Sequence, residues 1–460
     1  MSMNSPEKIL KVPMIQTTAG DWEQERFSRK QNFVEAMTVM LIILSALWLV
    51  AYPFGVVMKI KAVNSGVNLL LVLGGAYLLF VAPFLHKDTA QSWGLGNPIQ
   101  YGHLITRGPL IRRVMILLSS ITVFVGLNIV NYQQWYHVAR FFQMQELART
   151  FGLSVDVYQW PHHFPGVIFV FFFGAVISAL IAFCAIRYDN FHTAFRTAMI
   201  VSLPLLIVIF VSAYIQRGTG AFQQLSFSRW ALGVFGYIFW GFVQQLLFSS
   251  YFGTRFRKAF APSNSPANRV TGEEQIKKSL LFGLWGALVA ISFTCISISI
   301  AYGTKAIPSL TVWVQLILWL TVFFFPMGFI YGYFYCKDKK RMLVATLSAS
   351  CFGMIHIDSY GLVAVTWMLG IVLVYVFMEE KNRNLVALGF IHGLLGSTFG
   401  EMFSKGSAGV LNVDYSVGPW NVEEPTWGVL VIPVIVIVVY VFILITYLKK
   451  APEANETDGT

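Results

Sequence analysis

Apolar runs of about 20 residues recur along the whole chain, and no other feature of the sequence restricts the fold so strongly. A helix of that length rises about 30 Å, which matches the hydrocarbon core of a bilayer. Only 12% of the 460 residues are charged, whereas soluble domains carry about 25%. The sequence therefore predicts an all-α, polytopic helical membrane protein.

We place twelve transmembrane helices on these runs, with approximate bounds 33–57, 66–85, 113–131, 165–186, 193–214, 229–252, 279–302, 310–335, 342–357, 360–378, 385–401 and 427–447. Lys and Arg test this number, because cytoplasmic loops carry an excess of both. Of the 33 Lys and Arg residues, 24 fall on the side that holds both termini, 8 fall opposite, and Arg196 lies within a helix. Both termini are therefore expected in the cytoplasm, and the bacterial inner (cytoplasmic) membrane is the expected location.

The net charge of +11 follows from this cytoplasmic bias, which attracts anionic lipid and requires no nucleic-acid partner. We expect membrane lipids as partners, together with another membrane protein or transmembrane helix. The four cysteines show no CxxC pairing, so neither a disulfide framework nor a metal site is predicted. No cofactor is expected either.

Polar segments divide the chain into four parts. Residues 1–32 are predicted to form a cytoplasmic tail, and residues 33–220 an N-terminal group of transmembrane helices. Within that group, the segment near 132–164 has apolar positions at helical spacing and is expected to lie along the membrane interface. Residues 221–450 form a second transmembrane bundle, and the polar tail 451–460 is expected to be disordered.

Two histidines, His356 and His392, lie deep within apolar segments near the C-terminus. An ionisable side chain in hydrocarbon is costly, so it usually faces a bundle interior and marks a functional site. Gln244 and Gln245 form a polar pair in the middle of another apolar run. By the helical rise, these groups lie about 13 to 22 Å from a cytoplasmic arginine on their own helix. They are therefore expected to meet in the middle of the membrane.

The spacing of these residues has a familiar pattern. Phe352-Gly-Met-Ile-His356, followed after 35 residues by His392-Gly-Leu-Leu-Gly396, resembles the last two motifs of the CAAX-protease and bacteriocin-processing (CPBP, or Abi) family. Members of that family are intramembrane endopeptidases. Gly396 stands where the family has Asn or Asp.

The upstream motif of that family contains a pair of glutamates. Here Gln244-Gln245, with Arg255 downstream, resembles that motif with both carboxylates replaced by amides, and Ser249 stands at the position of the family's Arg. The resemblance implies a degenerate, glutamine-bearing member whose family-equivalent catalytic positions are Gln244, Gln245, His356 and His392.

A second register exists for the upstream motif. The segment that starts at Pro326-Met327 begins 30 residues before His356 and is similar to the same upstream motif of the family, but it has neither carboxylate nor Arg. We favour Gln244-Gln245, because a polar pair in mid-helix requires a structural reason. With that choice, the helices predicted at 279–302 and 310–335 form an inserted hairpin.

The resemblance implies that a glutamate, helped by histidine, activates water in the family's enzymes. A carboxamide oxygen has no usable pKa near neutral pH, so Gln244 cannot serve as that general base. Asp358 is the only nearby carboxylate in sequence, and Glu401 is expected at the far interface. Taken singly, either histidine could instead be interhelical hydrogen-bond glue, contributing on the order of 0.6 kcal/mol.

Three hypotheses follow, and they leave open whether the protein is an enzyme. The first is a pseudoprotease that acts as a membrane-complex subunit, assembly factor or regulator. The second is an active intramembrane endopeptidase that uses chemistry of His356 and His392. The third is a 12-span transporter.

Overall fold

The computed structural model describes residues 27–141, 144–223, 225–260, 272–302, 310–356, 360–403 and 427–450. Across these ranges the chain is helical and contains no strand, so the all-α prediction is confirmed for them. The predicted cytoplasmic tail up to residue 26, Asp358 and the tail 451–460 lie outside the described residues.

The helices of the N-terminal half are α1 (Arg29–Ser45) continued by the π-helix η3 (Ala46–Val57), α2 (Lys61–Ala76) continued by η4 (Tyr77–Val81) and α3 (Ala82–Leu85), η5 (Gln91–Trp93), α4 (Pro98–Thr106), α5 (Leu110–Gln133), α6 (Trp135–Phe141), α7 (Met144–Thr150), η6 (Val157–His162), α8 (Gly166–Ala179) continued by η7 (Leu180–Ala185), and α9 (Phe191–Arg217).

The helices of the C-terminal half are α10 (Gly220–Gln223), α11 (Phe227–Gln245) continued by the π-helix η8 (Leu246–Phe252) and α12 (Gly253–Phe260), α13 (Gly272–Tyr302), α14 (Leu310–Lys337), α15 (Lys339–Met354), α16 (Tyr360–Phe377), η9 (Glu380–Asn382), α17 (Leu385–Phe403), η10 (Trp427–Leu430) and α18 (Val431–Lys450).

Six helical segments within the described ranges are long and apolar enough to cross a membrane: Arg29–Val57, Leu110–Gln133, Gly166–Ala185, Phe191–Ile215, Phe227–Phe260 and Leu385–Met402. Shorter apolar helices occupy Leu69–Leu85, Val365–Phe377 and Pro433–Lys449. Each of these nine segments coincides with a predicted transmembrane run. The fold is thus that of a polytopic helical membrane protein.

The first helix begins earlier than predicted. Ser28 accepts a hydrogen bond from the backbone nitrogen of Gln31 at 3.2 Å, and the Gln31 side chain accepts one from the Ser28 nitrogen at 2.7 Å. This reciprocal capping box satisfies two backbone donors that a helix start leaves open. The helix therefore starts at Arg29, within the segment that the sequence assigned to a polar tail.

The predicted helix over 342–357 ends earlier than expected. In the structure α15 ends at Met354, and the backbone nitrogen of His356 bonds the carbonyl oxygen of Gly353 at 3.0 Å in a tighter final turn. His356 therefore follows the end of α15 instead of lying inside a transmembrane helix.

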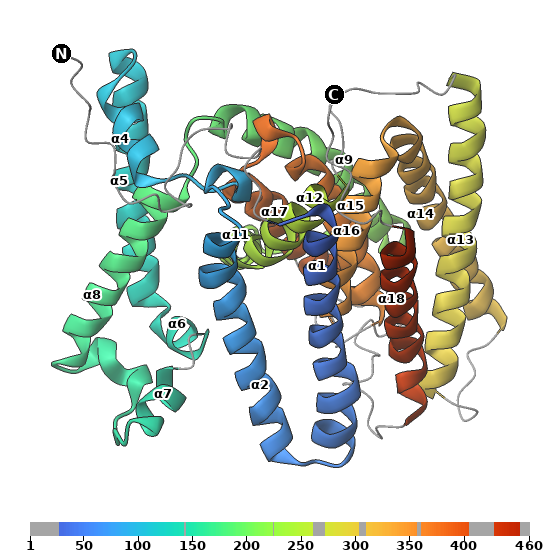
Figure 1. The fold of residues 1–460 in the computed structure, drawn as a ribbon, viewed down its shortest axis with the longest axis horizontal. Coiled ribbons are helices and arrows are strands. Elements are labelled where there is room, and N and C mark those ends of the chain that lie inside the picture. The colour runs from blue at the N-terminus through green and yellow to red at the C-terminus, as the bar shows by residue number, and fades with distance from the viewer. Residues whose placement is uncertain are drawn as a thin grey trace.

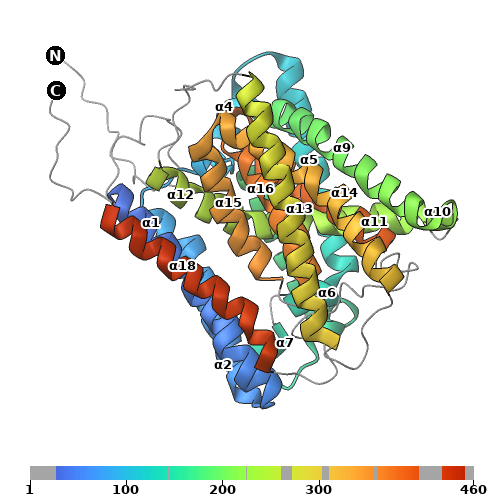
Figure 2. The same ribbon diagram turned by 90° about the vertical axis from the view of Figure 1, so that its right-hand side faces the viewer.

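The helices form a broad bundle, and among the described residues its two largest buried cores lie in the part that holds α1, α9 and α11–α18. Figure 1 shows α5 and α8 together at one edge, α13 at the other, and α11 and α17 between them. In Figure 2, α18 runs along α1. The larger core joins α1, α12, α15 and α18 around Phe33, Tyr251 and Phe352, and the second joins α9, α16 and α17 around Phe377 and Leu388.

The helices α13 and α14 pair closely with each other. A Cβ added at Gly328 would lie 2.4 Å from the carbonyl oxygen of Phe282, and one added at Gly283 would lie 3.0 Å from that of Phe325. Glycines therefore let the two backbones touch, as small residues do in membrane helix pairs. Among the described residues, neither of the two cores contains a member of this hairpin.

Candidate functional site

The candidate site lies where α11 crosses α17. Three glycines, which have no side chain, allow the two helices to approach closely at this crossing. A Cβ at Gly393 would lie 2.4 Å from the backbone nitrogen of Ile238, one at Gly389 would lie 2.8 Å from the carbonyl oxygen of Ile238, and one at Gly241 would lie 2.8 Å from the Cβ of His392. Gly389 and Gly393 have the small-xxx-small spacing of closely packed membrane helices. The contact brings His392 directly against α11.

Gln245 is fully buried and bridges two neighbours. Its Nε2 lies 3.3 Å from Nδ1 of His392, and its Oε1 accepts a hydrogen bond from the hydroxyl of Ser249. An amide donates only through its nitrogen, so Nδ1 of His392 is the acceptor, and the proton of the neutral ring lies on Nε2. The two polar ends of Gln245 are therefore both satisfied within the chain.

The ring of Phe352 contacts both of the histidines that the sequence predicts for the site. Its ring centroid lies 5.0 Å from that of His356 with the planes at 90°, and 5.5 Å from that of His392 with the planes at 60°. Nδ1 of His356 lies 2.8 Å from the carbonyl oxygen of Phe352. A carbonyl oxygen can only accept, so this nitrogen carries the proton. Both imidazoles thus contact the ring of Phe352, that of His356 from the turn after α15 and that of His392 from α17.

Gln244 differs from its neighbour. Its Oε1 is buried, and among the described residues no donor bonds it. A buried acceptor without a partner costs about 1–3 kcal/mol. The hydrogen-bonding capacity of this oxygen is therefore unused among the described residues.

Carboxylates lie apart from this cluster in the described part of the chain. Glu401 pairs with Arg229, whose Nη2 and Nε lie 2.8 and 3.1 Å from its two oxygens, and this pair ties the end of α17 to the start of α11. In the same ranges there is no group of three or more His, Cys, Asp and Glu side chains that could hold a metal ion. The site described here is thus an amide–imidazole cluster.

A second polar cluster, which the sequence did not predict as a unit, surrounds Asp88. This fully buried carboxylate pairs with Arg255 of α12, lies 3.0 Å from Nζ of Lys258, and accepts a hydrogen bond from Nε1 of Trp93 at 3.1 Å. Burial alone would raise the pKa of Asp88, but Arg255 and Lys258 lower it below its usual value. The arginine that follows Gln244-Gln245 in the sequence therefore belongs to this ionic cluster and not to the histidine site.

Glu35 extends the ionic cluster to α1. It accepts a hydrogen bond from the hydroxyl of Tyr251 at 2.7 Å, lies 3.7 Å from Nε of Arg255, and pairs with His86. Its position at the start of the first apolar run is typical of an interfacial residue, and the sequence carries no signal for these partners. The cluster joins α1, the turn after α3 and α12.

The turn that leads into α17 is also fixed by polar contacts. Asn384 accepts hydrogen bonds from the backbone nitrogens of Val386 and Ala387 and donates to the carbonyl oxygen of Arg187 at 2.7 Å. The neighbouring Arg383 donates to the carbonyl oxygens of the last turn of α16. Burial, and then the nearby arginines, hold the pKa of Arg383 well below its usual value. This turn sets the start, and hence the register, of the helix that carries His392.

Comparisons with family models, with curated proteins and with solved structures give no match to this chain.

Proposed function

We propose that this chain is a CPBP-like integral membrane protein that binds a transmembrane helix of another protein without cleaving it. It acts as a subunit, assembly factor or regulator of a membrane complex. It has twelve transmembrane helices with both termini in the cytoplasm, and it resides in a bacterial inner membrane.

The observation that carries this proposal is the hydrogen-bonded chain from Ser249 through Gln245 to Nδ1 of His392. A hydrolase of this kind needs a proton acceptor aimed at a water molecule. Here the family-equivalent position holds an amide, and that amide donates to the imidazole nitrogen that would otherwise accept a proton. The arrangement favours a fixed polar contact between helices over general-base catalysis.

Gln244 supports the binding role. Its buried Oε1 has no donor among the described residues, and polar side chains inside membranes stabilise helix association by about 0.6 kcal/mol per hydrogen bond. A partner helix that places a hydroxyl or amide donor near this oxygen would satisfy it. The partner is therefore expected to carry Ser, Thr, Asn or Gln within its membrane-spanning segment.

The topology rests on the distribution of charge. The 24-to-8 division of Lys and Arg favours twelve crossings with cytoplasmic ends, because basic residues are retained on that side. Helices occur in the structure at each of the twelve predicted runs. Cysteine accessibility at Lys87 and Lys59, which lie at opposite ends of the second helical segment, tests the orientation.

The test of function is a mild-detergent pull-down of the tagged protein from its native membrane, with stoichiometry from quantitative mass spectrometry. We expect one partner near one-to-one, and we expect Gln244→Ala to reduce its recovery. Gln133→Ala, which removes an exposed amide from α5, is the matched control. Recovery of no stoichiometric partner would contradict the binding role, and peptide fragments that disappear in His392→Ala membranes would contradict the absence of cleavage.

One observation favours a second candidate, the active intramembrane endopeptidase. Because Nδ1 of His356 bonds the carbonyl oxygen of Phe352, Nε2 is the basic nitrogen of the neutral ring, as a general base requires. This candidate predicts that His356→Gln abolishes a cleavage that wild-type membranes perform, while the protein is still produced and folded. Identical fragment patterns in both membranes would exclude it.

A further inference from the structure

A small unit that joins α5 to α8, here called the surface unit (residues 134–141 and 144–165), forms a buried core together with Val170 of α8. This core includes Trp135, Ala139, Ala148 and Val157. Nε1 of Trp135 donates to the carbonyl oxygen of Val157 at 2.7 Å. The unit is therefore a folded element and not a simple connecting loop.

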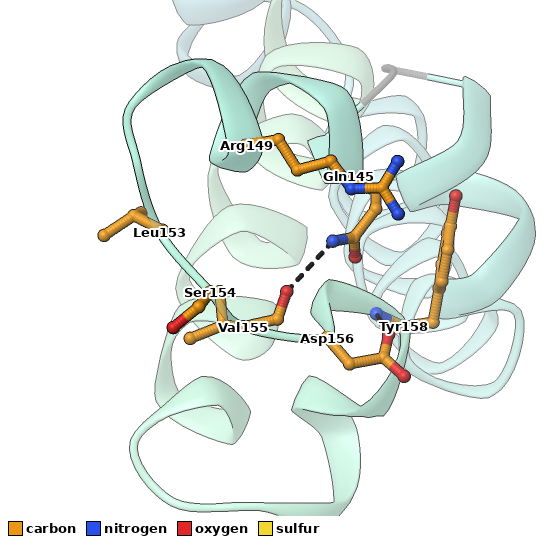
Figure 3. A pocket seen from close by; sticks show the side chains of 7 residues that line it. All are labelled: Gln145, Arg149, Leu153, Ser154, Val155, Asp156 and Tyr158. Atoms are coloured by element: carbon orange, nitrogen blue, oxygen red, sulfur yellow. Dashed lines mark hydrogen bonds between the residues drawn. The ribbon is translucent and has the colours of Figure 1, made fainter.

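Gln145 fixes the extended part of the surface unit. Its Nε2 donates to the carbonyl oxygen of Val155 at 2.9 Å, and its Oε1 accepts from the nitrogen of Val157 at 2.8 Å. These two bonds hold the backbone as a neighbouring strand would. Figure 3 shows the first of them, with Gln145 reaching across from α7.

Large apolar side chains nevertheless point outward from this unit. Leu147 is 56% exposed, Phe151 is 73% exposed and Leu153 is 51% exposed. Leu147 and Phe151 are four residues apart and therefore share one side of the chain as it leaves α7. Because the core of the unit is filled by other residues, these three side chains require a different apolar environment.

The lengths of the flanking helices place the unit at the membrane boundary. The helix α5 has 24 residues and so rises about 36 Å. The segment Gly166–Ala185 has 20 residues, which corresponds to about 30 Å. Arg113 near the start of α5 and Arg187 just after η7 mark the opposite boundary. Spanning a hydrocarbon core of about 30 Å therefore requires nearly the full length of both helices.

The surface unit is joined to α5 and α8 by very short connections. Only Gln134 separates α5 from α6, and Pro165 directly precedes α8. The two ends of the surface unit therefore lie at the level at which α5 and α8 leave the hydrocarbon.

We propose that the surface unit is an interfacial anchor whose apolar edge, formed by Leu147, Phe151 and Leu153, inserts among the lipids of the non-cytoplasmic leaflet. Leu153 shares the lining of an open hollow with Arg149 and Tyr158, and Figure 3 shows Tyr158 at the side of the hollow opposite Leu153. Arg and Tyr are favoured at the headgroup level, where an apolar stem and a polar tip are both accommodated. This inference does not depend on the proposed function of the histidine site.

Spin labelling tests the anchor directly. A nitroxide is placed at Phe151→Cys or at Ser154→Cys in a chain without its four native cysteines, reconstituted in vesicles of phosphatidylethanolamine and phosphatidylglycerol. We expect the label at 151 to be more accessible to oxygen, which partitions into lipid, than to a water-soluble nickel chelate. The label at 154 should show the reverse preference. Greater access of the nickel chelate at 151 would overturn the proposal, and so would protection from both reagents, which would indicate a protein partner.

A second measurement retains the native cysteines in case the cysteine-free chain does not fold. A membrane-impermeant maleimide is applied to vesicles with the non-cytoplasmic face outward, and the modified peptide is quantified by mass spectrometry. Because maleimides react with the thiolate, which requires water, Phe151→Cys should react about tenfold more slowly than Ser154→Cys. Equal rates would overturn the proposal.

Discussion

The amide nitrogen of Gln245 lies 3.3 Å from Nδ1 of His392, and this contact joins α11 to α17 inside the bundle. The adjacent glutamine, Gln244, makes no such contact and leaves its oxygen unsatisfied among the described residues. Two neighbouring amides of identical chemistry therefore differ: the Gln245 amide is bonded at both ends within the fold, and the oxygen of Gln244 has no donor among the described residues.

Replacement of Gln245 is expected to weaken the fold. Gln245→Ala leaves the hydroxyl of Ser249 and Nδ1 of His392 buried without their partner, which costs about 1–3 kcal/mol. The apparent melting temperature in detergent should fall, as measured by the recovery of monodisperse protein after heating. Gln244→Ala is the control and should not lower the melting temperature, because its oxygen has no donor to lose among the described residues. Equal losses in both variants would contradict this difference between the two amides.

The close contact between α11 and α17 gives a second prediction. Gly393→Ala would place a methyl group 2.4 Å from the backbone of Ile238, so the helices must separate, at a cost of about 1–3 kcal/mol. At Gly396 the nearest atoms to an added Cβ lie 3.7 Å away, which is ordinary contact. Gly396→Ala should therefore melt like the wild type and Gly393→Ala earlier. If Gly396→Ala melted earlier than Gly393→Ala, the close contact of α11 with α17 at Gly393 would be contradicted.

The ionic cluster around Asp88 should contribute strongly to stability. Asp88→Asn removes the buried carboxylate that pairs with both Arg255 and Lys258 and leaves Arg255 the longer contact with Glu35; breaking a buried pair costs about 3–5 kcal/mol. The control is Glu273→Gln, which removes an exposed pair with Lys277; exposed pairs contribute about 0–1 kcal/mol. Asp88→Asn should therefore melt at a clearly lower temperature than the wild type, and Glu273→Gln should melt close to the wild type.

The same carboxylate predicts a dependence on pH. The pKa of Asp88 is lower in the folded protein than its value of 3.8 without the fold. Its stabilising contribution is then complete above about pH 5 and is lost as the pH falls through the folded pKa. The difference in melting temperature between wild type and Asp88→Asn should be constant from pH 7 to about pH 5 and should narrow on further acidification. A difference that grows in acid would contradict the sign of the shift.

Hydropathy was sufficient to predict the helices, because burial in lipid requires long apolar runs whatever the neighbours are. The ends of helices depend on local hydrogen bonds that such runs do not record. The capping box at Ser28 lengthens α1, and the turn at His356 shortens α15. These two differences changed the expected surroundings of Asn32 and of His356.

The polar clusters were harder to predict. The ionic cluster joins Asp88 to a residue 167 positions away, and a single sequence contains no signal for such a pairing. The partner of His392 could have been found. Gly241, Gln245 and Ser249 are spaced by four residues and therefore share one helix face, and a glycine on that face indicates close approach of another helix.

The hairpin of α13 and α14 has a consequence for how such a chain can change over evolutionary time. It packs mainly on itself, and in the described ranges it contributes no residue to the two cores that support the site. In the proposed topology each of its two helices crosses the membrane once, and two crossings added or removed together leave the orientation of every later helix unchanged. With that topology, an ancestral gene could gain or lose the hairpin in one step without inverting α15 and α17, which position His356 and His392.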